Sequence, residues 1–210
     1  VAAATTVAMT DLRWSSDCTR ILAGLDVRRR VRVFDADTLE VVSELAMAAD
    51  KPTLLQGLVD WRGQVVAVAG DELGVWEMTT IAAQQASQHQ WSEATSPLAA
   101  EAEFPLAQRS PDVVDWPGLG AVVLIPGAAR EKQKAVLMVS LADTTRALGY
   151  IPTVGDQSAV RVHPSQRAFA VLSRYYVQLH DLETAKPTAL VDFGGVVQDI
   201  AWGPDFLAAA

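Results

Sequence analysis

The side chains best suited to chemistry are few in this sequence and lie far apart. There are three histidines, His89, His163 and His180, and a single cysteine, Cys18. A zinc site needs such ligands grouped together, and these four positions offer no cluster. A nucleophilic Cys18 would need an activating base beside it, and no histidine is close to it in sequence. The sequence therefore predicts no metal site, no cofactor and no catalytic residue.

Two other patterns also fail to indicate an enzyme. Gly194-Gly195 could suggest a phosphate-binding loop, but neither a Lys-Ser/Thr pair nor a predicted helix follows it. Asp71 and Glu72 are adjacent carboxylates, but they fall in a predicted turn, where water hydrates both side chains. The function therefore has to follow from the elements that the chain builds.

The composition is that of a globular chain. Of its 210 residues, 50% are hydrophobic and 20% are charged, which excludes disorder as the main state. The longest apolar run, residues 121–125, is far shorter than the roughly 20 residues that cross a bilayer. The net charge of −8 disfavours nonspecific nucleic-acid binding by the whole chain, and the single cysteine favours a reducing compartment. Because no signal peptide is visible, we expect an intracellular protein, cytoplasmic or nuclear, with no membrane insertion.

One sequence pattern recurs five times along the chain. A short predicted strand ends in a large ring, a polar turn follows, and a second, apolar strand comes next. Apolar runs such as 65–69 and 121–125, bounded by Gly, Pro, Ser or Asp, are typical of strands buried on both faces. The ring positions, spaced 39 to 55 residues apart, are Trp14, Trp61, Trp116, His163 and Trp202.

Most of these units continue with two further strands. Alternating segments at 31–35, 73–77, 136–140 and 176–181 predict half-buried third strands, and 40–45 and 189–193 predict fourth strands. Four antiparallel strands in every 40 to 55 residues are typical of a β-propeller blade. The alternative is an unrelated β-sandwich with regularly spaced strands.

The repeats resemble those of WD-repeat β-propellers. The third strand ends in Phe34-Asp35 in the first unit and in His180-Asp181 in the fourth, where the family has its Trp-Asp pair. The second unit has Trp76-Glu77 there and the third has Val139-Ser140. The resemblance implies an all-β propeller in which His163 and His180 are packing residues. It assigns structural roles to Trp14, Trp61, Trp116, His163, Trp202, Phe34, Asp35, Trp76, His180 and Asp181.

The repeats do not add up to a whole number of blades. The predicted blades span about 8–45, 54–108, 111–152 and 158–193, and 196–210 supplies half of another. We therefore expect residues 1–210 to form a partial propeller that belongs to a larger ring. The segment 81–103, rich in Gln, Ala and Ser, is expected to be a low-complexity insertion in the second blade, or else a docking segment anchored by Trp91.

Basic residues gather in the turns between second and third strands. Seven of the 17 basic residues fall there with four acidic ones, so these turns carry +3 in a chain of −8. In a propeller such turns lie on one face, which could be ordinary solvated surface or could attract an acidic partner. The candidate partner-binding residues are Arg28, Arg29, Arg30, Arg130, Lys132, Lys134, Arg174, Tyr175 and Trp91.

Three functions remain open from the sequence. The first is a noncatalytic scaffold or adaptor subunit, as the resemblance to WD-repeat platforms implies, with other protein subunits as its partners. The second is a ribonucleoprotein-associated subunit that contacts RNA or an acidic partner through the basic turns. The third is a propeller enzyme whose active site lies in blades not present here.

Overall fold

The structure is a computed structural model that divides into two compact units, Val1–Gln90 and Trp91–Ala210. The residues described are 9–25, 30–46, 55, 57–69, 72–77, 88–90, 110–130, 133–143 and 147–210.

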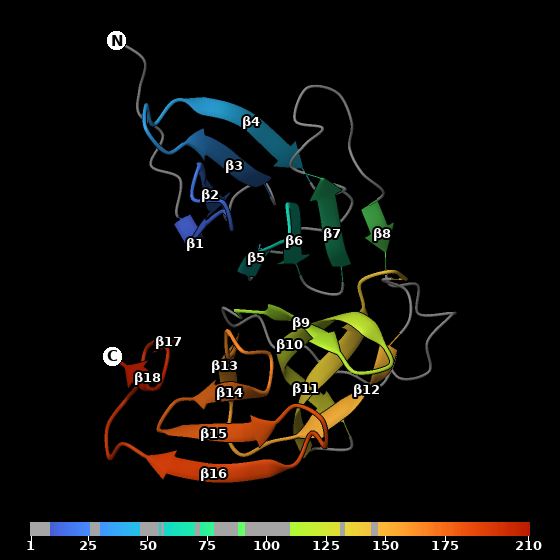
Figure 1. Ribbon diagram of the computed structural model, residues 1–210, viewed down its shortest axis with the longest axis vertical. Coiled ribbons are helices and arrows are strands. Elements are labelled where there is room, and N and C mark those ends of the chain that lie inside the picture. Colours follow the sequence, from blue (N-terminus) through green and yellow to red (C-terminus); the bar gives the residue numbers. More distant parts are fainter. Residues whose placement is uncertain are drawn as a thin grey trace. The chain divides into compact units, whose positions relative to one another are not determined.

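Unit 1 contains two four-stranded antiparallel sheets whose strands follow one another in chain order (Figure 1). The first sheet consists of β1 (Met9–Trp14), β2 (Arg20–Leu25), β3 (Arg30–Asp35) and β4 (Val41–Ala46). The second consists of β5 (Gly57–Trp61), β6 (Gln64–Ala69), β7 (Glu72–Glu77) and β8 (Gln88–Gln90).

The described part of unit 2 contains two further four-stranded antiparallel sheets and a two-stranded one (Figure 1). The third sheet consists of β9 (Asp112–Trp116), β10 (Gly120–Arg130), β11 (Gln133–Ser140) and β12 (Ala147–Pro152). The fourth consists of β13 (Gln157–Val162), β14 (Ala168–Ser173), β15 (Tyr176–Asp181) and β16 (Pro187–Asp192). The last pair is β17 (Ile200–Trp202) and β18 (Leu207–Ala209).

The prediction of an all-β chain made of four-stranded antiparallel sheets is confirmed. Among the described residues, no helix is long and apolar enough to cross a membrane.

The same turn joins the first two strands of the first and fourth sheets. Ser15 N–H donates to the Arg20 carbonyl, and His163 N–H donates to the Ala168 carbonyl, at 3.0 and 2.9 Å. Each turn has a residue with positive φ, Cys18 at 60° and Gln166 at 56°. Cys18 is therefore an exposed turn residue, as its place in the repeat suggested.

An aspartate closes the turn between third and fourth strands in the same two sheets. The carboxylate of Asp35 accepts from the N–H of Asp37 and of Thr38, and Asp181 accepts from the N–H and hydroxyl of Thr184. Hydrogen bonds to the charged form lower the pKa of both carboxyls, with the Thr38 N–H as the main cause at Asp35 and the Thr184 hydroxyl at Asp181. The aspartate at the family's Trp-Asp position therefore caps a turn in this chain.

The core lies between the sheets of each unit. In unit 1, Leu22 and Val33 of the first sheet pack with Leu58 and Trp76 of the second. In unit 2, a larger cluster joins the third and fourth sheets, and a smaller one joins the fourth sheet to β17 and β18. Apolar strands buried on both faces, which the runs 65–69 and 121–125 predicted, occur in β6 and β10.

Two local expectations need correction. Within the supposed insertion at 81–103, residues 88–90 form β8, which pairs with β7. Residues 81–87 and 91–103 lie outside the described residues. Arg130 and Lys134 belong to strands rather than to a turn, because the β10–β11 hairpin resumes pairing at Ala128 after an irregularity that follows Ile125.

Candidate functional site

Three aromatic rings of unit 2, those of Trp116, Phe169 and His180, lie against one another. Trp116 is 9% exposed, and its ring centroid lies 6.3 Å from that of Phe169. The Phe169 ring also stacks on that of His180, with centroids 4.7 Å apart and an interplanar angle of 10°. His180 is fully buried, and its Nδ1–H donates to the Ala185 carbonyl at 3.0 Å. Burial lowers the pKa of His180, which favours the neutral ring that stacks on Phe169.

His163 and Trp202 form a second pair of rings. Their centroids lie 4.8 Å apart in an edge-to-face arrangement, and the indole N–H of Trp202 donates to the Arg161 carbonyl at 2.9 Å. His163 Nδ1 lies 2.7 Å from the hydroxyl of Ser165 in its own turn. Both residues therefore hold the fourth sheet against β17 and β18.

Trp14, a predicted structural repeat position, ends β1 with an exposed side chain. Its side chain is 60% exposed, and Leu12 on the same side of β1 is also exposed. The strand meets the second sheet through its other residues, because Asp11 accepts from Leu58 N–H and Arg13 donates to the Leu58 carbonyl. Trp14 therefore lies at the end of its strand, as the repeat predicted, and its structural role stays a prediction.

The other predicted structural positions of unit 1 are buried or half-buried. Trp76 is buried in the core of unit 1. Trp61 is half-buried, with the Arg62 guanidinium 4.8 Å above its ring. Phe34 is half-buried at the end of β3, next to Asp35, whose carboxylate also pairs with Arg20 at 2.6 Å.

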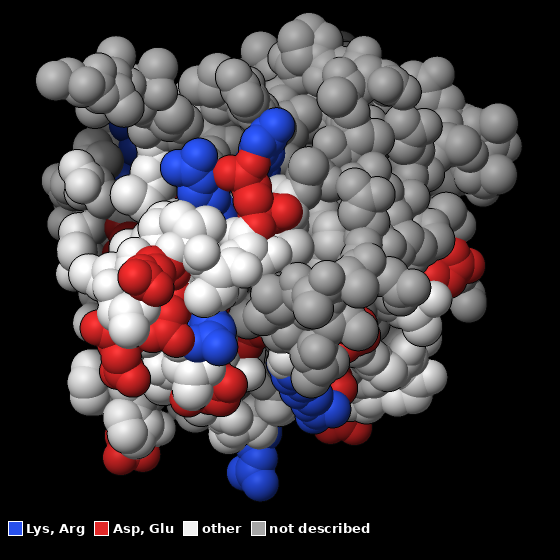
Figure 2. Space-filling model, turned by 90° about the horizontal axis from the view of Figure 1, so that it is seen from above, with Lys and Arg blue, Asp and Glu red and all other residues white. Residues whose placement is uncertain are grey.

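The predicted basic face is partly neutralised by acids that the sequence count omitted. Arg30 forms an ion pair with Glu44, which also binds Arg32 at 2.8 Å, and Lys134 lies 2.8 Å from Asp156. Figure 2 shows basic and acidic side chains interleaved on the face that it presents. Arg28, Arg29, Lys132 and Trp91 lie outside the described residues, as does the side chain of Arg130.

Glu44 could have been found from the sequence. Arg32 lies directly opposite Glu44 in the β3–β4 hairpin, and long side chains of opposite charge commonly pair across such a hairpin. Asp156 gave no comparable signal, because it lies in the segment between the third and fourth sheets and meets Lys134 only through the tertiary fold.

Arg174 and Tyr175 differ from the other basic positions because they join an aromatic, exposed surface. The Arg174 guanidinium lies 5.3 Å from the centre of the Tyr175 ring, and Tyr175 is 41% exposed. Phe193, also exposed, donates its N–H to the Tyr175 carbonyl at 3.2 Å. We call Arg174, Tyr175 and Phe193 the Arg174 surface. Arg and aromatic residues are the types that contribute most to protein interfaces.

The titratable groups of the described residues do not gather into a metal site. No three His, Cys, Asp or Glu side chains within those ranges are placed to hold an ion. The pKa of Asp17 is lowered to about 2, because the Ser15 hydroxyl and then the Thr19 N–H and hydroxyl donate to its carboxylate. These bonds hold the β1–β2 turn.

No family model matches the sequence, and no curated protein matches it. The fold, however, is similar to that of solved propellers. The WD40 domain of Neurospora crassa Pan2 has a TM-score of 0.70 at 9% identity, over 97% of this chain and 56% of that one. The β-propeller domain of Myceliophteria thermophila Cps50 (Swd1) has a TM-score of 0.65 at 12% identity, over 93% of this chain and 59% of that one. The chain therefore has a β-propeller fold and spans less than two thirds of either of these chains.

Proposed function

We propose that this chain is a noncatalytic scaffold that binds other proteins within a complex. The observation that carries the proposal is the Arg174 surface, in which a guanidinium, a tyrosine ring and a phenylalanine ring lie exposed at one end of the fourth sheet. Exposed aromatic and arginine side chains that lie together are typical of interface hot spots.

The backbone beneath this surface is held by hydrogen bonds. The Val197 N–H donates to the Arg174 carbonyl at 2.9 Å, and the Ser173 hydroxyl donates to the Tyr176 carbonyl at 3.2 Å. A surface that is ordered before binding loses less conformational entropy when a partner docks. This arrangement suits a platform that presents fixed contact residues.

A photo-crosslinking experiment tests the proposal in the intact protein. A benzophenone amino acid replaces Tyr175 in one version and Leu39, which is exposed in unit 1, in another. We expect position 175 to crosslink to another polypeptide in cells, with position 39 as the matched control. The double substitution Arg174→Glu with Tyr175→Ala should reduce recovery of that polypeptide at least tenfold. A protein that elutes alone after mild extraction, with no crosslink from position 175, would refute the proposal.

The other two functions stay predictions. RNA contact through the basic turns loses support at Arg30 and Lys134, because each of these side chains pairs with a carboxylate. An enzyme with its active site in other blades concerns residues that this chain does not contain.

A further inference from the structure

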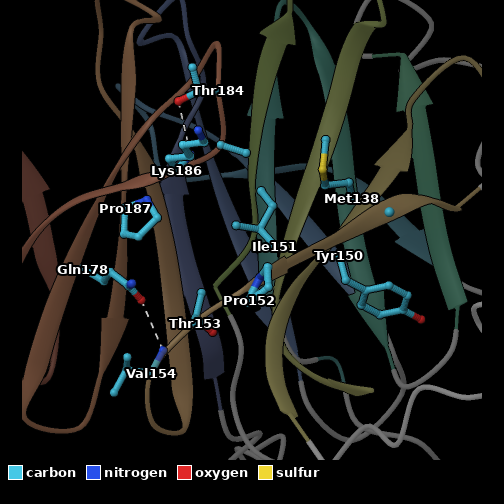
Figure 3. Close-up of a pocket in the computed structure, with 12 residues that line it drawn as sticks. Met138, Tyr150, Ile151, Pro152, Thr153, Val154, Gln178, Thr184, Lys186 and Pro187 are labelled. Atoms are coloured by element: carbon cyan, nitrogen blue, oxygen red, sulfur yellow. Dashed lines mark hydrogen bonds between the residues drawn. The ribbon is translucent and has the colours of Figure 1, made fainter. Parts of the chain in front are cut away.

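A groove of about 590 Å³ lies within unit 2, between the third and fourth sheets. One wall is β12 with the residues that follow it, and the other is β15 with the turn that leads to β16 (Figure 3). None of the residues that line it belongs to the Arg174 surface or to the predicted partner-binding residues. Its volume falls within the range of about 300–1,000 Å³ in which proteins bind small ligands and side chains.

The lining of the groove is mainly apolar. Met138 and Ile151 belong to the core cluster that joins the two sheets, so the groove is continuous with the core. Pro152, Val154 and Pro187 extend this apolar surface along both walls. Such a lining favours a bulky aliphatic or aromatic side chain over a polar one.

The walls are held in place without a ligand. The side-chain oxygen of Gln178, on β15, accepts a hydrogen bond from the Val154 N–H at 3.2 Å, which ties the two walls together (Figure 3). The Thr153 N–H donates to the Lys134 carbonyl at 3.0 Å and keeps this segment on β11. A groove that already exists in the free protein needs little reorganisation to bind.

The edge of β12 is poorly suited to pairing with an added strand. Pro152 has no N–H, and the N–H of Val154 is already bound by Gln178. A partner segment would gain few backbone hydrogen bonds here, so its side chains have to supply the recognition.

A positive charge at the groove indicates that the partner carries an anionic group. Lys186 is the single charged residue among the described lining, and it has no carboxylate partner within the described residues. The nearby Asp181 carboxylate is occupied by the N–H and hydroxyl of Thr184. The ammonium group of Lys186 therefore favours an anionic group on the partner.

We propose that the groove binds a short extended segment of a partner protein that carries one bulky apolar side chain and one carboxylate. The apolar side chain lies on Met138 and Ile151, and the carboxylate pairs with Lys186. The proposal rests on the scaffold function, because it names the chemistry of one partner contact, but it concerns a different surface.

A peptide array supplies the first test. The full chain is applied to synthetic eight-residue Gly/Ser peptides, each with one Leu, Ile, Met or Phe and one Asp or Glu at spacings of one to four residues. Matched peptides carry Asn or Gln in place of the acid, or Ser in place of the apolar residue. We expect retention of peptides with both features at least tenfold above both control sets. Equal retention of the amide peptides, or no retention, would overturn the proposal.

Variants with matched controls locate the binding. Lys186→Glu should weaken the best peptide about tenfold, because an attraction becomes a repulsion, and Val154→Asp should weaken it at least as much. The controls are Arg167→Glu and Val41→Asp, which change an exposed cation and an exposed valine outside the groove and should stay within twofold. Equal effects of groove and control variants would refute the site.

NMR of methionine methyl groups locates the binding without any substitution in the protein. With 13C-methyl-labelled methionine, the best peptide should shift the signal of Met138 and leave that of Met9 in unit 1 unchanged. An unshifted Met138 signal would contradict the proposal. So would a protein that is dimeric without peptide and that Val154→Asp makes monomeric, because the groove would then bind a second copy of this chain. If the crosslink from position 175 persists while no peptide binds, the groove proposal fails and the scaffold function stands.

Discussion

Replacing Gly74 by alanine should destabilise unit 1, because the indole of Trp76 covers the space that a Cβ would occupy. A Cβ built on Gly74 would lie 2.8 Å from Cζ3 and 2.9 Å from Cζ2 of Trp76, and closer still to Cη2. Ordinary carbon contacts begin near 3.4 Å, so the ring would have to recede by about 1 Å at its nearest atom. Trp76 is only 2% exposed and packs among Leu22, Val33 and Leu58, which leaves the ring no room to do so.

The size of the effect follows from two opposing terms. Overpacking a well-packed core costs about 1–3 kcal/mol. Gly→Ala also restricts the conformations of the unfolded chain, which stabilises the folded state by about 0.4–1 kcal/mol. We therefore expect Gly74→Ala to lower the free energy of unfolding of unit 1 by about 1–2 kcal/mol.

Gly203 provides a matched control in unit 2. A Cβ there would meet the ring of Phe206 at 2.5 Å from Cε1 and 2.9 Å from Cδ1, a clash of similar closeness. Phe206 is 62% exposed, however, so its ring can rotate into solvent. Neither glycine has a positive φ, so alanine fits both backbones. Gly203→Ala should change stability by less than about 0.5 kcal/mol.

Hydrogen exchange measures the difference in each unit separately. This is preferable to a global melting curve, because a chain with two units need not unfold in one step. Amides of β5–β7 should lose protection in Gly74→Ala, and amides of β17 and β18 should keep it in Gly203→Ala. In a protein that already carries Trp76→Leu, Gly74→Ala should destabilise unit 1 much less. Unchanged protection of β5–β7 in Gly74→Ala, or the same cost with Leu at position 76, would refute this reasoning.

Three further predictions concern titratable and basic groups. The unfolded chain protonates His180 near its ordinary pKa of 6.5, but burial lowers the pKa in the folded state. The stability of unit 2 should therefore be full above pH 6.5 and fall by up to about 1.4 kcal/mol per pH unit as the pH decreases below it. In His180→Phe, the unfolding free energy from urea titrations should depend less steeply on pH, and an identical pH dependence would count against this prediction. The pKa of Asp17, about 2, should rise toward 3.8 in Ser15→Ala when followed by 13C-carboxyl NMR, because its main hydrogen-bond donor is lost, and no change would contradict that assignment. If Arg28–Arg30 all contact phosphates, reversing their charges should change the binding of a 20-nucleotide single-stranded RNA. The slope of log K against log salt concentration should become shallower by about two. An unchanged slope would exclude RNA contact there.

The sheets could be predicted because their signals are local. Each hairpin brings together residues close in sequence, so apolar runs, alternating segments and turn residues identify the strands. The turn at Asp35 repeats at Asp181 because the same Asp and Thr spacing gives the same hydrogen bonds. β8 escaped prediction because its three residues, Gln88–Gln90, have no apolar alternation and depend on pairing with β7.

The candidate sites were harder to predict because they depend on which sheets meet. Trp14 and Trp116 have the same place in the repeat, yet one is 60% exposed and the other 9%. The repeat fixes where the side chain leaves its strand, but the neighbouring sheet decides whether it is covered. The groove has the same origin, since Gln178 and Val154 lie far apart in sequence and meet only when the two sheets pack.

The distribution of charge between sheets also bears on which partner is favoured. Counted along the chain, the turns between second and third strands are basic, but Arg30 shares Glu44 with Arg32, and Lys134 pairs with Asp156. Arg174 instead stacks on Tyr175 and has no carboxylate partner among the described residues. An RNA backbone requires several cations in succession, because each neutralised phosphate contributes to binding. Among the described basic positions of these turns, Arg174 beside exposed aromatic rings is better matched to a protein surface, where a few such residues carry most of the binding energy.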